Sequence, residues 1–511
     1  VTASMDTSDV KNGKYYNTTK TITTEFQERN YDDVKAFMKV TVDGTEKVYS
    51  MKQLLDGEGA KDGIIITSVD DTQKDLAENK RTDDRKVTYS VAVGNETDAD
   101  HSYSAISFEC TDCAGNNSSA SLGKEIVVDK IAPVMHITYS NGSDITKYVT
   151  TNANSPYFGN KDITATISVD EKHFAESGLE LKLSQKNNSG KDVSAYKGSL
   201  SPTGWASNGN KHTVSMQTFS GDAIYGLSGE FTDLAGNKAV AYDAHYFCVD
   251  KTAPTGKLYV TGSNGEKKEY SRKEAKDGGV LEFIFNLFDN KSVKIENEAA
   301  DATSGLKSIK YCIVDANADA AAKFTIDTDF ESLDWKDWTG ELKVNSDKIA
   351  VVFARLEDKA GNLTYISSDG GIIVDKKEAE APSITVEGGS LDYYKDNFTV
   401  NVTAKDPDNG GRGIFSGMKK ITYQLIDDNT GKKSKVKELV SSNTPRERKL
   451  TGKIQIDTSA WNTNNLRLHV VAEDFAGNTV EKDETYSVDA TAPVVTASMD
   501  TSDVKNGKYY N

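Results

Sequence analysis

The chain has 511 residues, of which 37% are hydrophobic and 27% charged, and its formal net charge at pH 7 is −17. Such a length usually corresponds to three or four domains, and the composition is typical of folded domains rather than disordered chain. The negative charge argues against nucleic acid as a partner, because phosphates would be repelled, and it favours the binding of hard cations. No run of eighteen apolar residues occurs, so we expect no membrane insertion of this segment.

A five-residue motif, Asp-x-Ala-Gly-Asn, occurs four times, and each copy is followed by a Val-Asp dipeptide that leads into Ala-Pro. We call the first residue of the motif the motif Asp and the second residue of the dipeptide the linker Asp. The four pairs of motif Asp and linker Asp are Asp112/Asp129, Asp233/Asp250, Asp358/Asp375 and Asp474/Asp489. Successive linker Asp residues lie 121, 125 and 114 positions apart. Units of that size can each bury a core, so the sequence predicts an array of similar domains.

The linker Asp residues divide the chain into four expected domains, at residues 1–130, 131–251, 252–377 and 378–490. Apolar and polar residues alternate along segments such as 163–169 and 398–404, which is the pattern of half-buried strands. Helical periodicity is weak, and only residues 52–58 and 293–303 are expected to hold a short helix or a loop. Many short strands separated by Gly, Asn and Asp turns predict an all-β chain of two-sheet sandwiches.

Short matching segments relate the domains in pairs. Residues 28–31 of the first domain match residues 171–174 of the second, since each begins with Glu, a basic residue and a polar residue before an aromatic ring. Residues 304–311 of the third domain and 416–423 of the fourth share a Ser-Gly-x-Lys-x-Ile-x-Tyr pattern. The chain is therefore expected to be built from two pairs of sister domains.

Proline marks the expected linkers, because half of the eight prolines follow a linker Asp. These are Pro133, Pro254, Pro382 and Pro493. Proline fixes φ and removes a donor, so it stiffens a short connection and suits the start of an edge strand. The third linker, residues 376–380, is longer and charged, and we expect the widest hinge there.

The two ends of the chain carry the same sequence, because residues 495–511 are identical to residues 1–17. We interpret residues 491–511 as the first strand of a next repeat, so that the four-domain block recurs in a longer protein. An alternative is that this segment is donated as a strand to another molecule, which would produce end-to-end polymerisation.

The Asp-x-Ala-Gly-Asn motif followed by Val-Asp-Lys-Thr-Ala-Pro, as at 233–237 and 249–254, resembles the bacterial immunoglobulin-like repeats of very large cell-surface proteins and adhesins. The resemblance covers essentially the whole chain. It implies immunoglobulin-like sandwiches strung into an elongated rod, an extracellular location at the cell surface, and calcium at the domain junctions. The export signal and the anchor are expected outside this fragment.

The motif has two interpretations at this stage. Gly and Asn tolerate left-handed backbone and the Asp side chain can cap turn amides, so the motif can simply make a tight turn. Alternatively, if each motif Asp lies beside the linker Asp that follows it, the two carboxylates and oxygens of the next domain form a calcium site. The candidate metal ligands are therefore Asp112, Asp129, Asp233, Asp250, Asp358, Asp375, Asp474 and Asp489.

A further acidic loop, Asp406-Pro407-Asp408-Asn409-Gly410, is similar to a calcium loop but lacks the third acid and the closing Glu of an EF-hand, which favours a plain turn. Cys110 and Cys113 form a lone Cys-x-x-C without the second pair that a zinc site needs. Cys110 aligns with apolar residues of the other domains, so we expect it in the core.

The expected function is that of a structural stalk, which holds a distal binding region away from the cell. The alternative is that the repeats themselves bind a host glycan or protein, or associate end to end into a fibre. A binding repeat would present aromatic residues on a shared face, and Trp205, Trp335, Trp338 and Trp461 are the candidates. Catalytic motifs are absent from the sequence, so we expect no enzyme and no cofactor other than calcium.

Overall fold

The computed structural model describes residues 1–316, 323–345, 347–504 and 507–508, and these residues form mostly strands. The helices of these described residues are short, namely α1 (Met51–Leu55), η1 (Ala60–Asp62), η2 (Glu78–Lys80), η3 (Thr146–Tyr148), η4 (Glu176–Gly178) and η5 (Phe330–Ser332). The prediction of an all-β chain is confirmed. None of the helices among the described residues is long and apolar enough to cross a bilayer.

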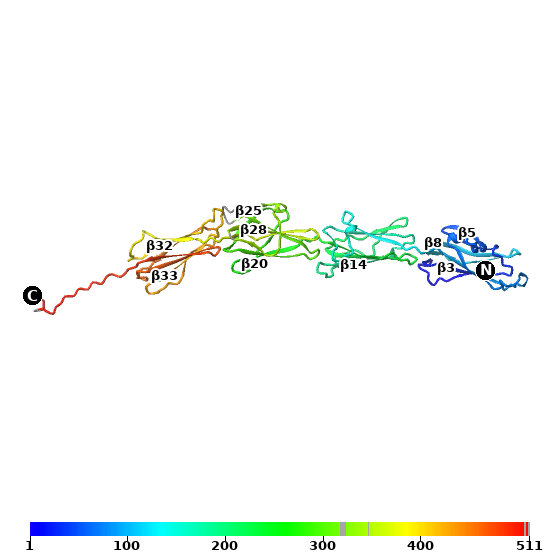
Figure 1. Cartoon of the computed structure of the whole chain (residues 1–511), viewed down its shortest axis with the longest axis horizontal. Coiled ribbons are helices and arrows are strands. Elements are labelled where there is room, and N and C mark those ends of the chain that lie inside the picture. The colour runs from blue at the N-terminus through cyan, green and yellow to red at the C-terminus, as the bar shows by residue number, and fades with distance from the viewer. Residues whose placement is uncertain (317–322, 346, 505–506, 509–511) are drawn as a thin grey trace. The chain divides into compact units, whose positions relative to one another are not determined.

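The described residues form two compact units, the first mainly Val1–Thr252 and the second mainly the residues that follow. Each unit contains two successive pairs of sheets, and each pair encloses a separate apolar core. We call the four pairs sandwiches 1 to 4 in chain order, and Figure 1 labels strands of each.

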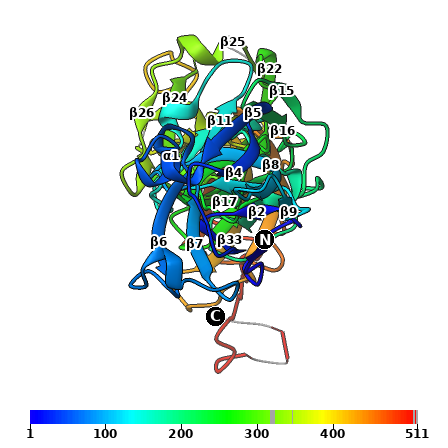
Figure 2. The ribbon, with the colours of Figure 1, turned by 90° about the vertical axis from the view of Figure 1, so that its right-hand side faces the viewer.

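Sandwich 1 has a four-stranded and a six-stranded sheet. The first contains, in spatial order, β1 (Thr2–Met5), β3 (Lys20–Gln27), β7 (Lys86–Val93) and β6 (Ile65–Asp71). The second contains β2 (Tyr15–Tyr16), β10 (Ile126–Asp129), β8 (Asp100–Thr111), β4 (Ala36–Val42) and β5 (Thr45–Ser50), with β9 (Asn117–Ser121) paired to β8. Figure 2 shows β6 and β7 side by side, as their antiparallel pairing requires.

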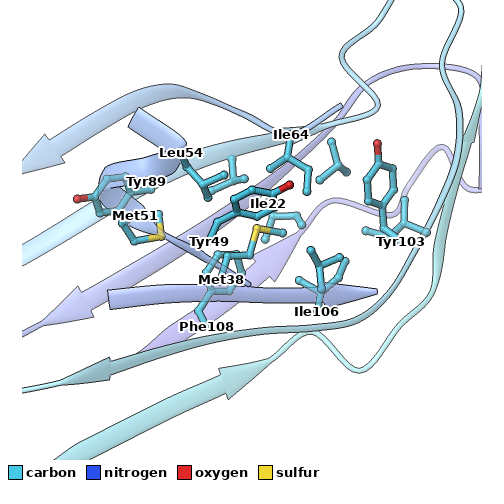
Figure 3. Packing of buried hydrophobic residues seen from close by; sticks show 14 of the residues in the cluster. Ile22, Met38, Tyr49, Met51, Leu54, Ile64, Tyr89, Tyr103, Ile106 and Phe108 are labelled. Carbon is cyan, nitrogen blue, oxygen red and sulfur yellow. The ribbon is translucent and has the colours of Figure 1, made fainter. Parts of the chain in front are cut away.

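The core of sandwich 1 follows from strict alternation along its strands. In β3, every second residue from Lys20 to Phe26 is buried, and Ile22 and Phe26 are almost completely inaccessible to solvent. Figure 3 shows Ile22, Met38 and Phe108 converging between the sheets. Residues 52–58, expected to hold a short helix or a loop, begin within α1, which ends at Leu55 and where Ser50 and Gln53 form a capping box.

Sandwich 2 has the strand order of an immunoglobulin domain. One sheet contains β11 (Val134–Ser140), β13 (Thr164–Asp170), β16 (Lys211–Ser215) and β15 (Ala206–Asn208). The other contains β12 (Tyr157–Gly159), β18 (Tyr242–Val249), β17 (Ala223–Phe231) and β14 (Leu179–Lys186). In the usual lettering these sheets are A-B-E-D and A′-G-F-C, and the short A′ strand runs parallel to the last strand. The immunoglobulin-like assignment therefore rests on topology.

Sandwich 3 is the most elaborated. Its smaller sheet contains β20 (Lys267–Glu269), β19 (Thr255–Thr261), β23 (Val293–Ala300) and β27 (Leu342–Val344). Its larger sheet contains β21 (Arg272–Lys273), β29 (Leu363–Ser367), β28 (Lys348–Asp358), β30 (Gly371–Val374), β22 (Gly279–Asp289) and β25 (Lys323–Thr328), with β24 (Leu306–Asp315) and β26 (Lys336–Asp337) alongside. The prediction of a helix or loop at 293–303 was wrong for β23, because that segment pairs with strands on both sides.

Sandwich 4 is the simplest. One sheet contains β31 (Glu380–Val386), β32 (Phe398–Lys405) and β35 (Lys449–Ile456), and the other contains β34 (Lys437–Ser441), β33 (Met418–Asp427), β36 (Leu466–Asp474) and β37 (Thr479–Tyr486). The described residues of the 491–511 segment form no strand, and Val495 and Met499 are exposed. Residues 505, 506 and 509–511 of that segment lie outside the described part of the chain.

Candidate metal centres at the Asp-x-Ala-Gly-Asn turns

Each motif Asp begins a tight turn and caps it with its own carboxylate. Asp233 Oδ1 accepts hydrogen bonds from the main-chain N–H groups of Ala235, Gly236 and Asn237, at 2.7–2.8 Å. Gly236 has a φ of 95°, which a side chain would disfavour. The Asn237 side chain donates back to Asp233 Oδ2 at 2.8 Å. The predicted turn chemistry is therefore confirmed.

The predicted pairing of each motif Asp with the linker Asp that follows it is wrong. In sandwich 1, Asp112 follows the last residue of β8, whereas Asp129 lies opposite Asp100, the first residue of that strand. The twelve residues of β8 rise by roughly 40 Å, so the two carboxylates belong to opposite ends of the sandwich. The strand that follows each motif runs antiparallel to the strand before it. Seventeen residues are enough for it to bring the chain back to the opposite end of the sandwich.

The other three predicted pairs are separated in the same way. Asp250 follows Val249, which pairs with the first residue of β17, while Asp233 lies beyond the end of that strand. Val374 pairs with Lys348, the first residue of β28, so Asp375 lies at the opposite end of that strand from Asp358. Tyr486 likewise pairs with Leu466, the first residue of β36, so Asp489 lies at the opposite end of that strand from Asp474.

The structure instead brings a linker Asp together with the motif Asp of the next sandwich. In the first unit, Asp129, Glu171 and Asp233 each offer a carboxylate oxygen, and these oxygens lie within 4.8 Å of one another. We call these three residues the Asp129 cluster. Asp129 ends β10, Glu171 follows β13 and Asp233 follows β17, so one ligand comes from sandwich 1 and two from sandwich 2. All three side chains are buried.

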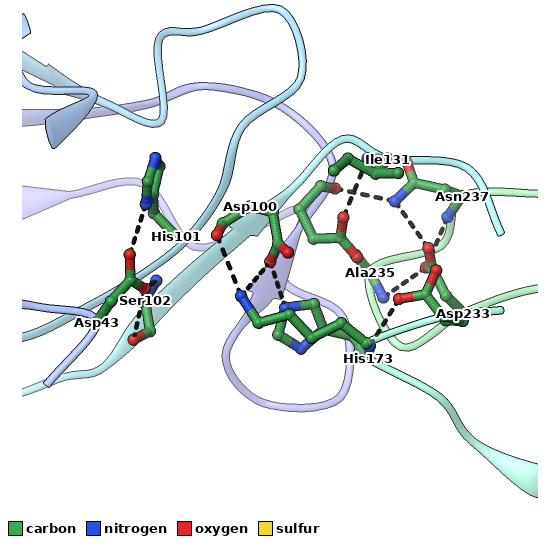
Figure 4. A network of polar contacts seen from close by, with 12 residues as sticks. Asp43, Asp100, His101, Ser102, Ile131, His173, Asp233, Ala235 and Asn237 are labelled. Carbon is green, nitrogen blue, oxygen red and sulfur yellow. Dashed lines mark hydrogen bonds and ion pairs between the residues drawn. The ribbon is translucent and has the colours of Figure 1, made fainter. Parts of the chain in front are cut away.

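The Asp129 cluster is held by main-chain donors and leaves one oxygen without a partner. Asp129 Oδ1 accepts from Ile131 N at 3.0 Å, and Glu171 Oε1 accepts from His173 N at 2.6 Å. Asn237 joins the two sandwiches, because its side chain donates to the main-chain oxygen of Asp129 at 2.9 Å (Figure 4). Asp129 Oδ2 is buried and makes no hydrogen bond with any described residue.

A second cluster of the same kind lies in the second unit. Asp375, which follows β30, Asp406, which follows β32, and Asp474, the last residue of β36, offer carboxylate oxygens within 4.8 Å of one another. We call them the Asp375 cluster. All three side chains are inaccessible to solvent. Sandwich 3 supplies the linker Asp, and sandwich 4 supplies the other two ligands.

The hydrogen bonds of the Asp375 cluster repeat those of the first. Asn478 donates to Asp474 Oδ2 at 2.7 Å and to the main-chain oxygen of Asp375 at 3.0 Å. Asp375 Oδ2 accepts from Ser416 N at 2.9 Å. Asp406 Oδ2 accepts from Gly417 N at 2.7 Å, whereas Asp406 Oδ1 is buried and has no hydrogen-bond partner among the described residues. Each cluster therefore contains one buried carboxylate oxygen without a partner.

The electrostatics of both clusters disfavour the ionised carboxylates. Burial is the main cause that raises the pKa of Asp129 to about 6 and of Glu171 to about 7, and the neighbouring acids of the cluster add to the effect. Burial likewise raises the pKa of Asp406 to about 7 and of Asp474 to about 6, and it raises that of Asp375. Within the described residues, no Lys, Arg or His side chain forms an ion pair with any of these carboxylates.

The arrangement fits a hard divalent cation. Oxygen-only ligands, three acidic groups and an unpartnered oxygen aimed into a buried site are the chemistry that calcium uses. A cation would also satisfy the two orphan oxygens, which otherwise cost free energy as buried polar atoms without partners. The residues that would hold it are those of the Asp129 and Asp375 clusters.

The remaining predicted ligands belong to neither cluster. Asp112 caps the turn of its own motif, accepting from Asn116 N and Nδ2 at 2.7 Å. Asp489 is exposed beyond β37. Asp358 caps its turn by accepting from Asn362 N at 2.8 Å. Asp250 Oδ1 accepts from Thr252 N at 3.1 Å, as expected for a linker Asp.

Sequence reasoning did not assign two of the six ligands, Glu171 and Asp406. Both follow the second long strand of their sandwich, a position without a local motif. The match between residues 28–31 and 171–174 was a usable signal for Glu171. Asp406 opens the acidic loop for which a plain turn was favoured, and its neighbour Asp408 does cap that loop, accepting from Gly413 N at 2.8 Å.

The four tryptophans pack against their own sandwiches. Trp205 contacts Phe174 at a centroid distance of 4.8 Å, Trp335 contacts Tyr365, and Trp338 contacts Tyr311. Trp461 packs against the core of sandwich 4. Each tryptophan therefore has a packing role at the edge of its sandwich.

No family model matches this chain, and no curated protein is recognisably similar to it in sequence. Among solved structures, it is similar to a tetra-tandem repeat in the extending region of a large adhesion protein, with 13% identity over 96% of this chain and 99% of that chain and a TM-score of 0.28. Domains A168–A170 of titin match with 13% identity over 70% of this chain and 99% of theirs, at a TM-score of 0.24.

Three N-terminal domains of the highly immunogenic outer capsid protein of bacteriophage RB49 match with 10% identity, over 71% of this chain and 99% of that chain, at a TM-score of 0.24. Likenesses with identities and TM-scores this low do not identify a function. The immunoglobulin-like fold rests on the strand order of the sandwiches themselves.

Proposed function

We propose that this chain is a spacer in a repetitive surface protein, and that divalent cations, calcium in the first instance, lock successive sandwiches at the Asp129 and Asp375 clusters. One observation carries the proposal. In both units, three carboxylates from two successive sandwiches converge in a buried site, and one carboxylate oxygen in each has no hydrogen-bond partner among the described residues. Calcium would neutralise their mutual repulsion and fix the angle between the two sandwiches.

Direct contacts between successive sandwiches beside each cluster support this proposal, because they hold the ligands of the two sandwiches close together. In the first unit, Asn12 of sandwich 1 donates to the main-chain oxygen of Leu234 at 2.7 Å, and Tyr15 packs edge-on against His173. In the second unit, the rings of Phe288 and Phe475 lie 5.9 Å apart across the same kind of junction. Lys172 and His173 also pair with Asp100 in the first unit, and Ile414 of sandwich 4 packs with Ile349 and Ile373 of sandwich 3 in the second. The ion would therefore add to direct contacts that already bring the two sandwiches together.

The proposed location is extracellular, at the cell surface. The sequence resembles the immunoglobulin-like repeats of bacterial surface proteins, and calcium-locked modules work where calcium reaches millimolar levels, outside the cell. A spacer of this kind holds a distal binding region away from the surface. The packing of the tryptophans against their own sandwiches gives no observation that favours the alternative of ligand-binding repeats.

Small-angle scattering of the chain in calcium and in excess chelator tests the proposal. We expect the maximum dimension to be largest in calcium and to shrink, with a broader distance distribution, when the ion is removed. Asp129→Asn and Asp375→Asn should each show part of that change in calcium. Glu378→Gln is the matched control, because Glu378 is an exposed acid of the same linker as Asp375. Curves that do not respond to chelator would contradict the proposal.

A further inference from the structure

Sandwich 1 carries two of the three acidic positions of a cluster at the end where Asp112 lies, opposite the end that carries Asp129. Glu28 follows β3 as Glu171 follows β13, and its Oε1 accepts from Asn30 N at 2.8 Å, the bond that Glu171 makes with His173. Asp112 caps its turn through Asn116, as Asp233 does through Asn237. A cavity of about 130 Å³ is lined by both acids.

This end of sandwich 1 is open where the equivalent ends of sandwiches 2 and 4 are covered. Ala114 is exposed, whereas its equivalents Ala235 and Ala476 are 0% and 9% exposed. Among the described residues, the Asn116 side chain donates to Asp112 only, whereas Asn237 also donates to the main-chain oxygen of Asp129. The open end therefore has the donor and the two acids of a junction and lacks the linker.

The matching linker lies at the other end of the block. Asp489 Oδ1 accepts from Thr491 N at 3.1 Å, which is the local turn that Asp129 makes with Ile131 at 3.0 Å. Pro493 stands four positions after Asp489, as Pro133 does after Asp129. Asp489 is exposed, so its carboxylate is available to a partner.

The sequence after this linker identifies the partner. Residues 495–511 are identical to residues 1–17, and in the first copy Val1, Ala3 and Met5 pack along β1 against the core of sandwich 1. In the second copy, Val495 and Met499 are 88% and 66% exposed. The apolar face of this segment is therefore complementary to the β3 edge of a sandwich like sandwich 1, on which β1 lies.

We infer that the Glu28–Asp112 end of sandwich 1 is the acceptor half of a further cation-locked junction, and that its occupant is the Val488–Pro493 linker of a preceding copy of this block in the same chain. Asp489, Glu28 and Asp112 would take the roles of Asp129, Glu171 and Asp233. This inference rests on the proposed function, since a bound cation is what would offset the mutual repulsion of the three acids.

Cys113 provides a native reporter for the inferred junction. Of the four cysteines, Cys110, Cys248 and Cys312 are buried, as expected for Cys110, and Cys113 is exposed. Cys113 occupies the second position of the motif, where Leu234 and Phe475 meet the preceding sandwich. A preceding block would therefore cover this thiol and slow its reaction with a maleimide.

The test is a two-copy chain in which residues 1–494 are followed directly by residues 1–511, with Cys113→Ser in the first copy. In calcium, the labelling rate of the remaining Cys113 should fall at least about tenfold relative to the single-copy chain, because labelling would require local opening of the junction. Asp489→Asn in the first copy should restore the fast rate. Asp98→Asn in the first copy is the matched control, because Asp98 is an exposed acid that takes no part in the inferred junction.

The outcomes separate this inference from the proposed function. If the single-copy chain binds calcium through the Asp129 and Asp375 clusters while Cys113 of the two-copy chain still labels fast, the inferred junction is wrong and the proposed function stands. If neither chain binds calcium, both fail. Protection of Cys113 in the single-copy chain that increases with its concentration would show a partner in a separate molecule and overturn the assignment to the same chain.

Discussion

The turn at Asp112 and the turn at Asp474 have the same sequence pattern and the same hydrogen bonds, yet their electrostatics are opposite. Hydrogen bonds from Asn116 lower the pKa of the Asp112 carboxyl, which is only partly buried. Burial raises the pKa of Asp474 to about 6, against similar bonds from Asn478. The difference comes from sandwich 3, which removes water from the turn and adds the carboxylate of Asp375 to those of Asp406 and Asp474. A local motif therefore becomes a candidate metal site only when another domain covers it.

The largest difference between a covered motif turn and an uncovered one should come from calcium binding. At a calcium concentration about 100 times the dissociation constant, one site stabilises the folded state by about 2.7 kcal/mol. Asp406→Asn should remove that gain from the second unit, and the melting temperature in calcium should fall by several degrees. Differential scanning calorimetry in calcium and in chelator measures this. Glu378→Gln should behave as the wild type, and a calcium-independent loss in Asp406→Asn would instead indicate a purely structural role.

A smaller effect is expected from the asparagine of the motif. Asn478 is buried and its side chain donates to three acceptors, the main-chain oxygens of Asp375 and Lys377 and Asp474 Oδ2. Asn478→Ala should therefore cost about 1–3 kcal/mol by leaving the main-chain oxygen of Asp375 without its donor. Asn116→Ala, in the exposed turn, should cost well under half as much, because water replaces the lost donor. Urea denaturation of both variants compares them directly. Equal costs would mean that the covering sandwich does not change the energetics of the turn.

The smallest effect should appear as a pH dependence in calcium-free buffer. Folded-state pKa values near 7 for Glu171 and Asp406 exceed their ordinary values of 4.5 and 3.8. The folded chain therefore binds more protons than the unfolded chain between about pH 4 and 7, and stability should rise as the pH falls from 7.5 to 5. Asp112, whose pKa is lowered, contributes in the opposite direction.

Urea titrations at pH 7.5 and 5.0 in chelator check this sign. The double variant Glu171→Gln with Asp406→Asn should show a weaker pH dependence than the wild type, because two of the raised groups are gone. In calcium the trend should reverse, since protons compete with the ion for the same carboxylates. Stability that falls on acidification in chelator would contradict the burial of ionisable carboxylates at the junctions.

Much of the fold could be predicted from the sequence because its signals are local. Alternation along β3 and β32 specifies half-buried strands, and the Asp, Gly and Asn of the motif specify the turn and its caps. The elaborations of sandwich 3 could not be predicted. Strand β23 ends in Ala-rich, acidic residues, and it is a strand because β19 and β27 pair with it.

Four of the six residues of the candidate site were predicted from the sequence, and their pairing was mispredicted. Asp129, Asp233, Asp375 and Asp474 all belong to clusters, but Asp233 and Asp474 each meet the linker Asp that precedes them by about a hundred residues rather than the one that follows. Spacing alone does not state at which end of a strand a residue lies. The third ligands come from a strand far from the motif in sequence, so only comparison between domains points to them.

The most direct test of cation-locked junctions is a calorimetric calcium titration of the chain beside three single variants. Asp233→Asn and Asp474→Asn should each bind one equivalent of calcium fewer than the wild type, because each removes a ligand from one cluster. Asp112→Asn, the same change in the same turn without a covering sandwich, should bind as many as the wild type. Equal stoichiometry in all four proteins, or no binding at all, would contradict the account.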